Sequence, residues 1–505
     1  MDWKEEYKRK LASAEEAVKV VKSGDRVAIS LAQDLWIIPD ALFARKDELR
    51  GVEILQGVTA TNYPWQQPGC EESFTVNCGQ FTGPLPRQMT WEKRGDFTAV
   101  TYAMEFKDQD EQRPGYIDPD VSIVVVSAPN EHGFCSFGEA MWEKKEFVKR
   151  AKKTIAEVDA HRIRTGGDNF IHISEIDYFV EATPYSPSRE ELDQFWAERT
   201  AQLGPEKAQK LKAAYDEANC PWYELWKFKD AMSVIDVAIP FDTMYNLMTQ
   251  TVLSVGPIPE HVKGIAHYVN QLIKDGDCIQ IGTGNTSNPL IRAGVFDGKH
   301  DLGFHCEVAP PGVPELVRDG VFTGKYKKLH TGKAVCTSFW PSSTRRQDEL
   351  EIINENPLFE LYGSHYTNNH IVIAANDNHM SINNALYVDL TGQVDSETIP
   401  GFLLWNGPGG QMDWVIGALN SKGGRSVTVL PATAVSGSIS RIVPLMEEGL
   451  MVTVPRTYAD LIVTEYGIAS LMGKSQRRRA EELISIAHPD HRAELKKEAQ
   501  KLFWP

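Results

Sequence analysis

Paired cysteines are missing from this sequence. Its seven cysteines, among 505 residues, are odd in number, widely scattered and never spaced as CxxC; they stand at positions 70, 78, 135, 220, 278, 306 and 336. A disulfide framework or a zinc ribbon needs regularly paired cysteines, so neither is expected. Unpaired cysteines are typical of a reducing compartment, and we expect a cytoplasmic protein.

Basic charge and long apolar runs are also scarce. Lys and Arg number 53 against 69 Asp and Glu, a formal net charge of -16, which opposes attraction to the phosphates of nucleic acids. No apolar run approaches the length that spans a bilayer, and the opening MDWKEEYKRK has no apolar core of a signal peptide. We therefore expect neither nucleic-acid nor membrane binding. An apolar fraction of 42% still allows packed cores, and the length favours more than one domain.

Several catalytic motifs are absent. The sequence contains no GxSxG, no Walker A loop, no HExxH helix and no EF-hand loop. Serine hydrolases, P-loop ATPases, zincins and calcium sensors therefore lose support. His305 and Cys306 are neighbours, but adjacent residues of a strand face opposite ways and no third ligand follows at a suitable spacing, so no metal site is expected.

An internal repetition is what the sequence does contain. VVKSGDRVAIS at residues 20–30 is similar to LIKDGDCIQIG at residues 272–282. Each stretch ends an amphipathic pattern of helical spacing, and Gly24 or Gly276 is suited to cap that helix. A short strand with an apolar character follows in each case, which predicts two related units.

Helices and strands are predicted to alternate in both halves. The strand-like runs VSIVVVSAP, HIVIAAND and SVTVLPA are separated by helical stretches such as KKEFVKRAKK and MDWVIGALNSKGG. This pattern predicts the α/β class, with two similar open domains built on largely parallel sheets. A charged segment at about 186–229 is predicted to be a helical insert or linker. We therefore expect an N-terminal domain at 1–230 and a C-terminal domain at 231–505, covered at its end by the last helix KSQRRRAEELISIA and the polar ending HRAELKKEAQKLFWP.

One carboxylate stands where open α/β sheets place their ligands. Glu307 follows the strand-like DLGF, and the carboxyl ends of parallel strands border the binding crevice. Glu307 is therefore a candidate nucleophile or general base. A solvated loop carboxylate without a function is the alternative.

Two glycine-rich turns precede predicted helices. IGTGN contains Gly282 and Gly284, and WNGPGGQMDW places Gly409 and Gly410 before a helix that begins near Gln411. Glycine lets backbone N–H groups approach an anionic atom, and a helix N-terminus adds positive potential. Both turns are candidates for binding an oxyanion or a phosphate, with a tight turn that binds nothing as the alternative.

Two basic segments could meet phosphates in an otherwise acidic chain. They are KYKKLHTGK at residues 325–333 and the group formed by Lys474 with residues 477–479. Solvated surface is the alternative interpretation of each.

An ordered set of longer segments resembles the acetyl-CoA hydrolase/transferase family, and more narrowly its 4-hydroxybutyrate or butyrate CoA-transferase branch within the class I CoA-transferases. The segments are HCE at 305–307, GPGGQMDW, SINNALYVDLTGQVDSE, SGSISRIVP and VTEYGIASLMGKSQRRRAEELISIAHPDHR. VVVSAPNEHGFCSFG and FIHISEIDYFVE in the first half are also similar to family segments. The resemblance implies two similar α/β domains, an active site in the cleft between them, and a homodimer.

The resemblance also implies roles for single residues. Glu307 matches the family glutamate that becomes covalently loaded with CoA, and Glu465 matches a carboxylate that lines the acid pocket. The implied CoA-binding turn comprises Gly282, Thr283, Gly284, Asn285 and Thr286. The implied second loop, which lies against the thioester, comprises Gly409 and Gly410. The implied partners are an acyl-CoA and a small carboxylic acid. CoA would be substrate and covalent intermediate, with no permanently bound cofactor and no metal.

The implied activity is transfer of CoA from a short-chain acyl-CoA to a carboxylic acid, by a ping-pong mechanism through a glutamyl-CoA thioester. The residues themselves leave two alternative functions open. One is an acyl-CoA hydrolase, for example of acetyl-CoA, that uses the same glutamate. The other is a non-catalytic CoA-binding protein that keeps the fold.

Overall fold

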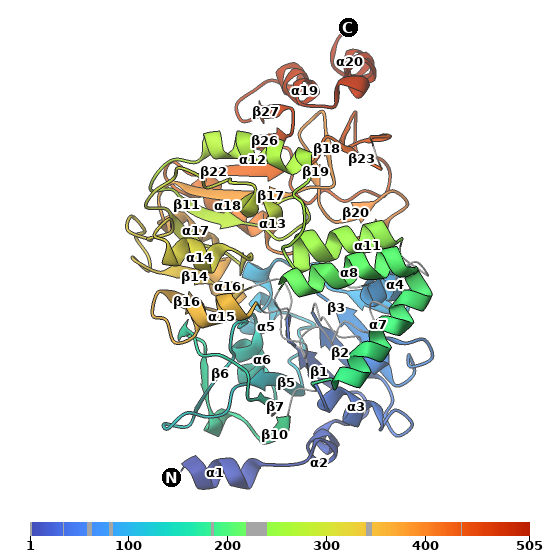
Figure 1. Ribbon diagram of the computed structural model, residues 1–505, viewed down its shortest axis with the longest axis vertical. Helices are drawn as coiled ribbons and strands as arrows, with labels where there is room; N and C mark the ends of the chain where they lie inside the picture. The colour runs from blue at the N-terminus through green and yellow to red at the C-terminus, as the bar shows by residue number, and fades with distance from the viewer. Residues whose placement is uncertain are drawn as a thin grey trace. The chain divides into compact units, whose positions relative to one another are not determined.

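Each of two compact units in the computed structural model contains a sheet of largely parallel strands (Figure 1). The structure describes residues 3–33, 35–57, 63–79, 84–182, 186–218, 240–339, 346–435 and 437–505. Within these, unit 1 takes its residues from Met1–Val100, Met104–Val255 and Thr337–His365, and unit 2 from Thr101–Ala103, Gly256–Cys336 and Tyr366–Pro505. The expected boundary between residues 230 and 231 lies outside the described residues.

Unit 1 is built on a seven-stranded sheet in the order β10-β7-β5-β1-β2-β3-β4, and every neighbouring pair is parallel. All residues of β5 are buried, as expected for a parallel sheet covered on both faces. The strands are β1 (Arg26–Ile29), β2 (Val52–Gln56), β3 (Phe74–Cys78), β4 (Gly95–Phe97), β5 (Val121–Val126), β7 (Lys153–Asp159) and β10 (Tyr178–Ala182). Its helices include α1 (Trp3–Lys10), α2 (Ala14–Ala17), α3 (Ile38–Phe43), α4 (Pro84–Trp91), α5 (Lys107–Asp110), α6 (Lys144–Arg150) and α15 (Gln347–Ile353). Two further pairs of short strands come from residues of unit 1: β6 (Phe134–Ser136) with β9 (Phe170–His172), and β8 (Gly166–Gly167) with β16 (Phe359–Leu361).

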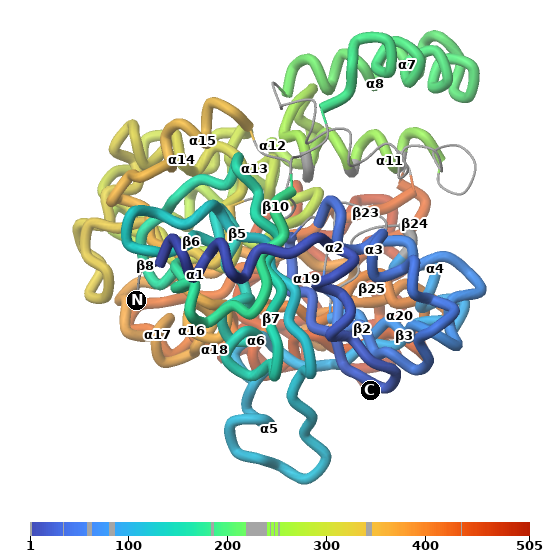
Figure 2. Tube along the Cα trace, turned by 90° about the horizontal axis from the view of Figure 1, so that it is seen from below, coloured from blue at the N-terminus to red at the C-terminus, as the bar shows by residue number. Residues whose placement is uncertain are grey.

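The charged segment predicted to be helical forms two helices, α7 (Arg189–Leu203) and α8 (Pro205–Ala218), which lie side by side (Figure 2). Ser188 caps α7 because its side chain accepts the N–H of Glu191, and Gly204 ends the helix with φ +81. Apolar side chains of both helices pack against α11 (Phe241–Leu247) in a shared core. The helical prediction is confirmed for residues 189–218, whereas residues 219–229 lie outside the described part.

Unit 2 carries the strand order β27-β26-β22-β17-β11-β12-β14. Each neighbouring pair in this order is parallel except for β26 with β27, which is antiparallel. The strands are β11 (Cys278–Ile281), β12 (Gly303–His305), β14 (Ala334–Cys336), β17 (His379–Asn384), β22 (Arg425–Val429), β26 (Leu461–Thr464) and β27 (Gly467–Ser470). The predicted α/β class with largely parallel sheets is therefore confirmed.

Helices and small sheets complete unit 2. α12 (Glu260–Leu272) packs against β26, and α18 (Gln411–Asn420) packs against β17 and β22 (Figure 1). The other helices include α13 (Asn288–Arg292), α14 (Val313–Arg318), α17 (His370–Ala375), α19 (Gln476–Ser485) and α20 (Pro489–Phe503). The short strands include β18 (Tyr387–Asp389), β19 (Val394–Asp395), β20 (Thr398–Ile399), β21 (Leu403–Leu404), β23 (Thr433–Ala434), β24 (Ile439–Ser440) and β25 (Ile442–Val443). As predicted, α19 and α20 cover the core, since Leu483 and Leu495 are buried in it. No helix among the described residues is both long and apolar enough to cross a membrane.

The two repeated stretches lead into corresponding strands. β1 lies between β5 and β2, and β11 lies between β17 and β12, so each is the strand at which the order of its sheet reverses. Ligands of open α/β sheets bind at the carboxyl ends of the strands around such a point. Gly24 and Gly276 have positive φ of +82 and +79, as caps would, but the helices end earlier, at Val20 and Leu272. The prediction that these glycines cap helices was wrong; they form the turn that leads into the strand.

The segment HIVIAAND, predicted to be a strand, is helix α17. The side chain of Asn369 accepts the N–H of Ile371 at 2.9 Å and so caps the helix. Ile373 is buried and packs against Gly417 of α18, whereas Ile371 is 80% exposed. A short apolar run fits both a strand and a helix, and here the cap and the packing of one face decide for the helix.

Candidate active site

Glu307 stands directly beyond β12, at the carboxyl end of the sheet of unit 2, and is half-buried. The residue before it fixes the main chain, because the buried Sγ of Cys306 lies within hydrogen-bond distance of two carbonyl oxygens, that of Ile281 at 3.3 Å and that of Val308 at 3.0 Å. The ring of His305 is also buried, and its Nε2 lies 3.0 Å from the carbonyl oxygen of Thr367. Both side chains thus belong to the interior. Within the described ranges no three His, Cys, Asp or Glu side chains gather as a metal site would require.

Two neutral donors meet the carboxylate of Glu307. Nδ2 of Asn368 donates to Oε2 at 2.7 Å, and Nε1 of Trp414 approaches the same oxygen at a longer 3.4 Å. Asn368 follows Thr367, whose carbonyl meets His305, and Trp414 comes from α18. Side chains from separate segments therefore hold this carboxylate in one orientation.

A buried cluster of aromatic rings supports Trp414, which is 1% exposed. The ring of His379 stacks on it at 5.7 Å with an interplanar angle of 26°, and His305 meets it at 5.7 Å and 61°. Burial lowers the pKa of His379 to about 3 and the pKa of His305 well below its usual value. Both imidazoles are therefore neutral near pH 7, and the indole N–H is fixed by packing rather than by charge.

The turn at Gly409 and Gly410 lies against Glu307. A Cβ atom at Gly410 would stand 2.0 Å from Oε2 of Glu307 and 2.0 Å from Nδ2 of Asn368, so a side chain at this position would displace these groups. Gly409 has φ +55 and turns the chain into α18. Among the described residues neither glycine N–H has a hydrogen-bond partner. Two backbone donors at a helix N-terminus thus stand beside a carboxylate.

The turn formed by Gly282, Thr283, Gly284, Asn285 and Thr286 joins β11 to the segment that enters α13. Gly284 donates its N–H to Oδ1 of Asn288 at 3.2 Å, and the hydroxyl of Ser287 bonds to the carbonyl oxygen of Gly282. The hydroxyl of Thr283 is buried without a partner in the part of the chain that is described. Asn285 is exposed and Thr286 is buried, so the turn has one polar side chain toward solvent and one toward the interior. Since β11 pairs with β12, this turn and Glu307 leave neighbouring strands at the same edge.

Glu465 occupies a different place on that edge. It follows β26, which is separated from β17 by β22, and its Oε2 accepts the N–H of Ala432 at 2.9 Å. His261 and Arg441 interact with it electrostatically, and burial lowers the pKa of both. The described hydrogen bonds of Glu465 reach neither Glu307 nor the two glycine turns. The structure therefore brings Glu307 together with Gly410, but gives no such contact for Glu465.

The basic segments are occupied by partners within unit 2. Lys325 pairs with Asp301 at 3.0 Å and Lys328 with Asp377 at 2.7 Å, while the buried Nζ of Lys327 donates to the carbonyl oxygens of residues 304 and 333. In the second segment, Lys474 pairs with Glu482, and residues 477 and 479 donate to backbone carbonyls. These contacts favour the surface interpretation of both segments.

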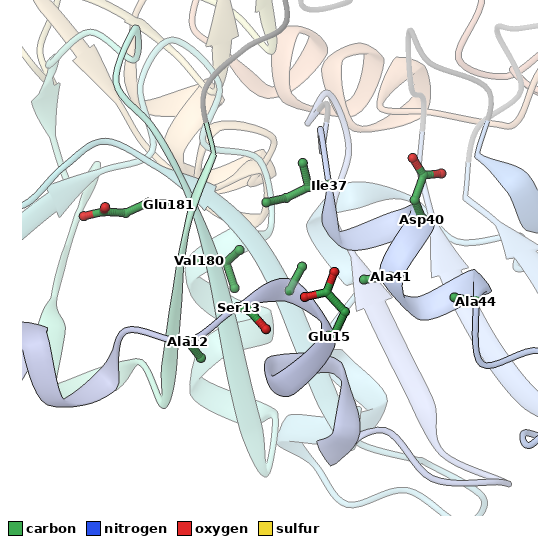
Figure 3. Close-up of a pocket in the computed structure, with 10 residues that line it drawn as sticks. Ala12, Ser13, Glu15, Ile37, Asp40, Ala41, Ala44, Val180 and Glu181 are labelled. Atoms are coloured by element: carbon green, nitrogen blue, oxygen red, sulfur yellow. The ribbon is translucent and has the colours of Figure 1, made fainter.

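A hollow of about 570 Å³ lies in unit 1 and is drawn in Figure 3. Three carboxylates, of Glu15, Asp40 and Glu181, stand around it, and Glu181 accepts the hydroxyl of Tyr7 at 3.0 Å. The rest of its lining is Ala12, Ser13, Ala14, Ile37, Ala41, Ala44 and Val180. None of the residues predicted for the active site belongs to this hollow.

Sequence reasoning missed three side chains that the structure places at the site: Asn368, Trp414 and Asn384. Asn384 ends β17 at the carboxyl edge of the sheet, and a polar residue at that position was a usable signal. Trp414 follows Gly410 by one helical turn, which also could have pointed to it. Asn368 precedes a segment that the sequence suggested to be a strand, and nothing local marked it.

Two family models match the chain. The acetyl-CoA hydrolase/transferase N-terminal domain matches residues 1–185, and the C-terminal domain of the same description matches residues 346–499. Together they span the first part of unit 1 and most of the last part of unit 2.

Relatives of known name align over the full length. The chain is 34% identical over 505 residues to the 4-hydroxybutyrate coenzyme A transferase of Clostridium kluyveri, covering 100% of both chains. It is 32% identical over 509 residues to the succinyl-CoA:cyclohexane-1-carboxylate CoA transferase of Geobacter metallireducens, covering 99% of this chain and 97% of the relative. Among solved structures, RipA from Yersinia pestis matches with a TM-score of 0.77 and 27% identity, covering 100% of both chains.

Proposed function

Because the chain belongs to the acetyl-CoA hydrolase/transferase family, we propose that it is a CoA-transferase that moves CoA from a short-chain acyl-CoA to a carboxylic acid, with Glu307 as the nucleophile. The observation that carries this proposal is the packing of the Glu307 carboxylate against the glycine turn before α18. A carboxylate that accepts from neutral donors, beside backbone N–H groups without a partner in the described part of the chain, is suited to attack a thioester carbonyl. Relatives named as CoA transferases support the same reaction class.

The proposed first step forms a bond between a carboxylate oxygen of Glu307 and the acyl carbon. Collapse of the tetrahedral intermediate breaks the C–S bond and gives an acyl-glutamyl anhydride with CoA thiolate. The thiolate then attacks the glutamyl carbonyl and expels the acyl group as a free carboxylate, which leaves CoA on Glu307 as a thioester. A second acid repeats these steps in reverse and leaves as the new acyl-CoA, so the kinetics are ping-pong.

Negative charge develops on an oxygen in each tetrahedral intermediate. We assign its stabilisation to the N–H groups of Gly409 and Gly410, which stand at the N-terminus of α18. Loss of one such donor typically costs about a hundredfold to a thousandfold in kcat. The turn of residues 282–286 is the proposed contact for CoA, with the buried hydroxyl of Thr283 as a further donor.

Glu465 is proposed to line the pocket of the carboxylic acid. Arg441 and His261 lie in its electrostatic neighbourhood, so this group of side chains could recognise a polar substituent on the acid. The two named relatives at 34% and 32% identity carry different acids in their names, so the acid of this chain is a matter for experiment. CoA serves here as substrate and as covalent intermediate.

A trapping experiment tests the nucleophile. The protein is incubated with an acyl-CoA, reduced with borohydride and analysed by peptide mass spectrometry. We expect the Glu307 peptide to carry the reduced modification in the wild type and to lack it in Glu307→Gln. Glu315→Gln is the matched control, because Glu315 is also a half-buried glutamate of the same segment and lies in α14. An unmodified wild-type peptide would refute covalent catalysis and favour a non-catalytic CoA-binding protein.

An acceptor screen separates transfer from hydrolysis. Free thiol is measured with one acyl-CoA donor in the presence and absence of acetate, butyrate or a hydroxy acid, and the new acyl-CoA is detected by chromatography. A transferase forms the new thioester only when an acceptor is present and releases little thiol. Thiol release at the same rate with and without acceptors would instead identify a hydrolase.

A further inference from the structure

Asn384 is the last residue of β17 and stands beside the first of the two glycine turns. β17 pairs with β11 in parallel, with Ile382 opposite Ile281, so both strands end at the same edge of the sheet (Figure 1). The side chain of Asn384 is half-buried.

The side-chain amide of Asn384 bonds to the turn of residues 282–286 and to Ser287, the residue that follows it. Its Nδ2 donates to the carbonyl oxygen of Thr283 at 3.1 Å and to the hydroxyl of Ser287 at 2.7 Å. Its Oδ1 accepts the N–H of Ser287 at 3.0 Å. A Cβ atom at Gly284 would stand 2.6 Å from Nδ2, so the turn also approaches the amide at its middle. Both amide hydrogens and the amide oxygen are therefore engaged with this turn and with Ser287, the residue that follows it.

The main chain of Asn384 reaches the second turn. Its carbonyl oxygen accepts Nε2 of Gln411 at 3.1 Å and the hydroxyl of Ser396 at 2.9 Å. Gln411 is the first residue of α18 and follows Gly410, whose Cα faces the carboxylate of Glu307. One residue thus bonds to the turn beside β11 and to the helix start that carries the other turn.

We propose that Asn384 is a positioning residue that sets the turn of residues 282–286 relative to the turn before α18. This inference rests on the proposed function, because it assigns the turns to CoA binding and to the thioester. The reacting carbonyl must meet Glu307 and the donors of both turns at once, and a misplacement of about 1 Å can cost a hundredfold in rate. Asn384 acts through the turns and is not assigned a contact with the substrate.

The test uses Asn384→Asp, which keeps the shape of the side chain and removes both amide donors. The carbonyl oxygen of Thr283 then faces a carboxylate oxygen instead of an N–H group, so the turn is expected to move. The matched control is Asn270→Asp in the same unit. Asn270 also uses Nδ2 to bridge two segments, donating to the carbonyl oxygens of Val295 and Asp297 at 3.0 Å each, and it contacts none of the proposed site residues.

Three quantities are measured on the full-length proteins: the rate constant for labelling of Glu307 by acyl-CoA, the KM for acyl-CoA, and the melting temperature. We expect Asn384→Asp to lower the labelling rate constant by about 10-fold to 100-fold and to raise KM. Asn270→Asp should lower the melting temperature at least as much while both kinetic constants stay within about threefold of the wild type. A purely structural role would reduce the active fraction and leave KM and the labelling rate constant unchanged.

Gly284→Ala disturbs the contact between the turn and the Asn384 amide by a change in the turn itself. It tests the proposal independently if Asn384→Asp does not fold. Its Cβ atom enters the space of the amide, so the same fall in labelling and rise in KM are expected. Labelling at the wild-type rate in either folded variant would overturn the positioning role and leave the proposed function standing. A wild-type protein that is not labelled at all would overturn both.

Discussion

Replacement of Gly410 by alanine tests the geometry of the proposed nucleophile most directly. The backbone of Gly410, with φ -92 and ψ 4, allows alanine, so the effect comes from space and not from backbone strain. The new methyl group would stand 2.0 Å from Oε2 of Glu307 and 2.0 Å from Nδ2 of Asn368. Contacts of this kind are relieved only beyond about 3 Å, so the carboxylate or the turn must move by about 1 Å.

A displacement of that size separates Glu307 from the N–H groups that are proposed to receive the oxyanion. We expect kcat/KM for acyl-CoA to fall about 100-fold, which corresponds to about 2.7 kcal/mol of transition-state stabilisation. The assay is steady-state transfer from acyl-CoA to a carboxylate, together with the rate of covalent labelling of Glu307.

Gly417→Ala provides the control from the same helix. Its Cβ atom would stand 2.6 Å from Cβ of Ile373, so α18 is also crowded, but at the interface with α17 and away from Glu307. This variant should lower the melting temperature and label Glu307 with a rate constant within about threefold of the wild type. Equal labelling of Gly410→Ala and wild type would show that the turn does not constrain the carboxylate, and the reasoning about the site would fail.

Three other changes test separate parts of the structure. Asn368→Asp places a second carboxylate 2.7 Å from Glu307. Because the two carboxylates cannot ionise together, the acid limb of the pH–activity profile should move up by about 1 pH unit or more. An acid limb at the wild-type pH would contradict the contact. Burial lowers the pKa of His379 from 6.5 to about 3, so on acidification this residue takes up a proton in the unfolded chain before it does so in the folded protein; the free energy of unfolding should therefore fall below pH 6.5, by up to about 1.4 kcal/mol per pH unit. Urea unfolding of His379→Phe should show a flatter dependence of this free energy on pH. Equal slopes for the variant and the wild type would argue against a neutral buried ring. Ile373→Asp should lower the free energy of unfolding by roughly 3 kcal/mol or more because Ile373 is buried, and Ile371→Asp by less than about 0.5 kcal/mol because Ile371 is exposed. Similar losses for the two variants would indicate a strand, in which both side chains share a face.

The sheet architecture was predictable because buried strands, and the alternation of strands with helices, produce recognisable apolar patterns in the sequence. The run VSIVVVSAP contains β5, whose residues are all buried, and apolar residues without interruption are typical of such a strand. The run HIVIAAND has the same local character but a different structure. Its helical structure depends on the cap formed by the side chain of Asn369 and on packing against α18. A count of apolar periodicity includes neither contact.

The repeated glycines show a similar limit. Gly24 and Gly276 both adopt the left-handed conformation that their sequence context suggested. A positive φ serves a helix cap and a turn before a strand equally well. The sequence therefore indicated the backbone angle but not the element to which the glycine belongs.

Part of the candidate site could be proposed from the sequence. Glu307 and the two glycine turns could be found from strand ends, helix starts and family segments. The amide of Asn368 comes from a segment 61 residues further along the chain, and only the fold brings it to the carboxylate. The contacts of Asn384 depend on which strands lie beside β17, and the order of strands is not encoded locally.

The chemical nature of these added side chains bears on why a carboxylate would react at this place. Asn368 and Trp414 are uncharged donors, and the two histidines packed on the indole are held neutral by burial. A cation in the same position would bind the carboxylate about twice as strongly as a neutral donor. That stabilisation would be lost when the oxygen becomes part of an anhydride, so it would raise the barrier to acylation. The amide of Asn368 and the indole of Trp414 orient Glu307 without adding such a cost to the acylation proposed above.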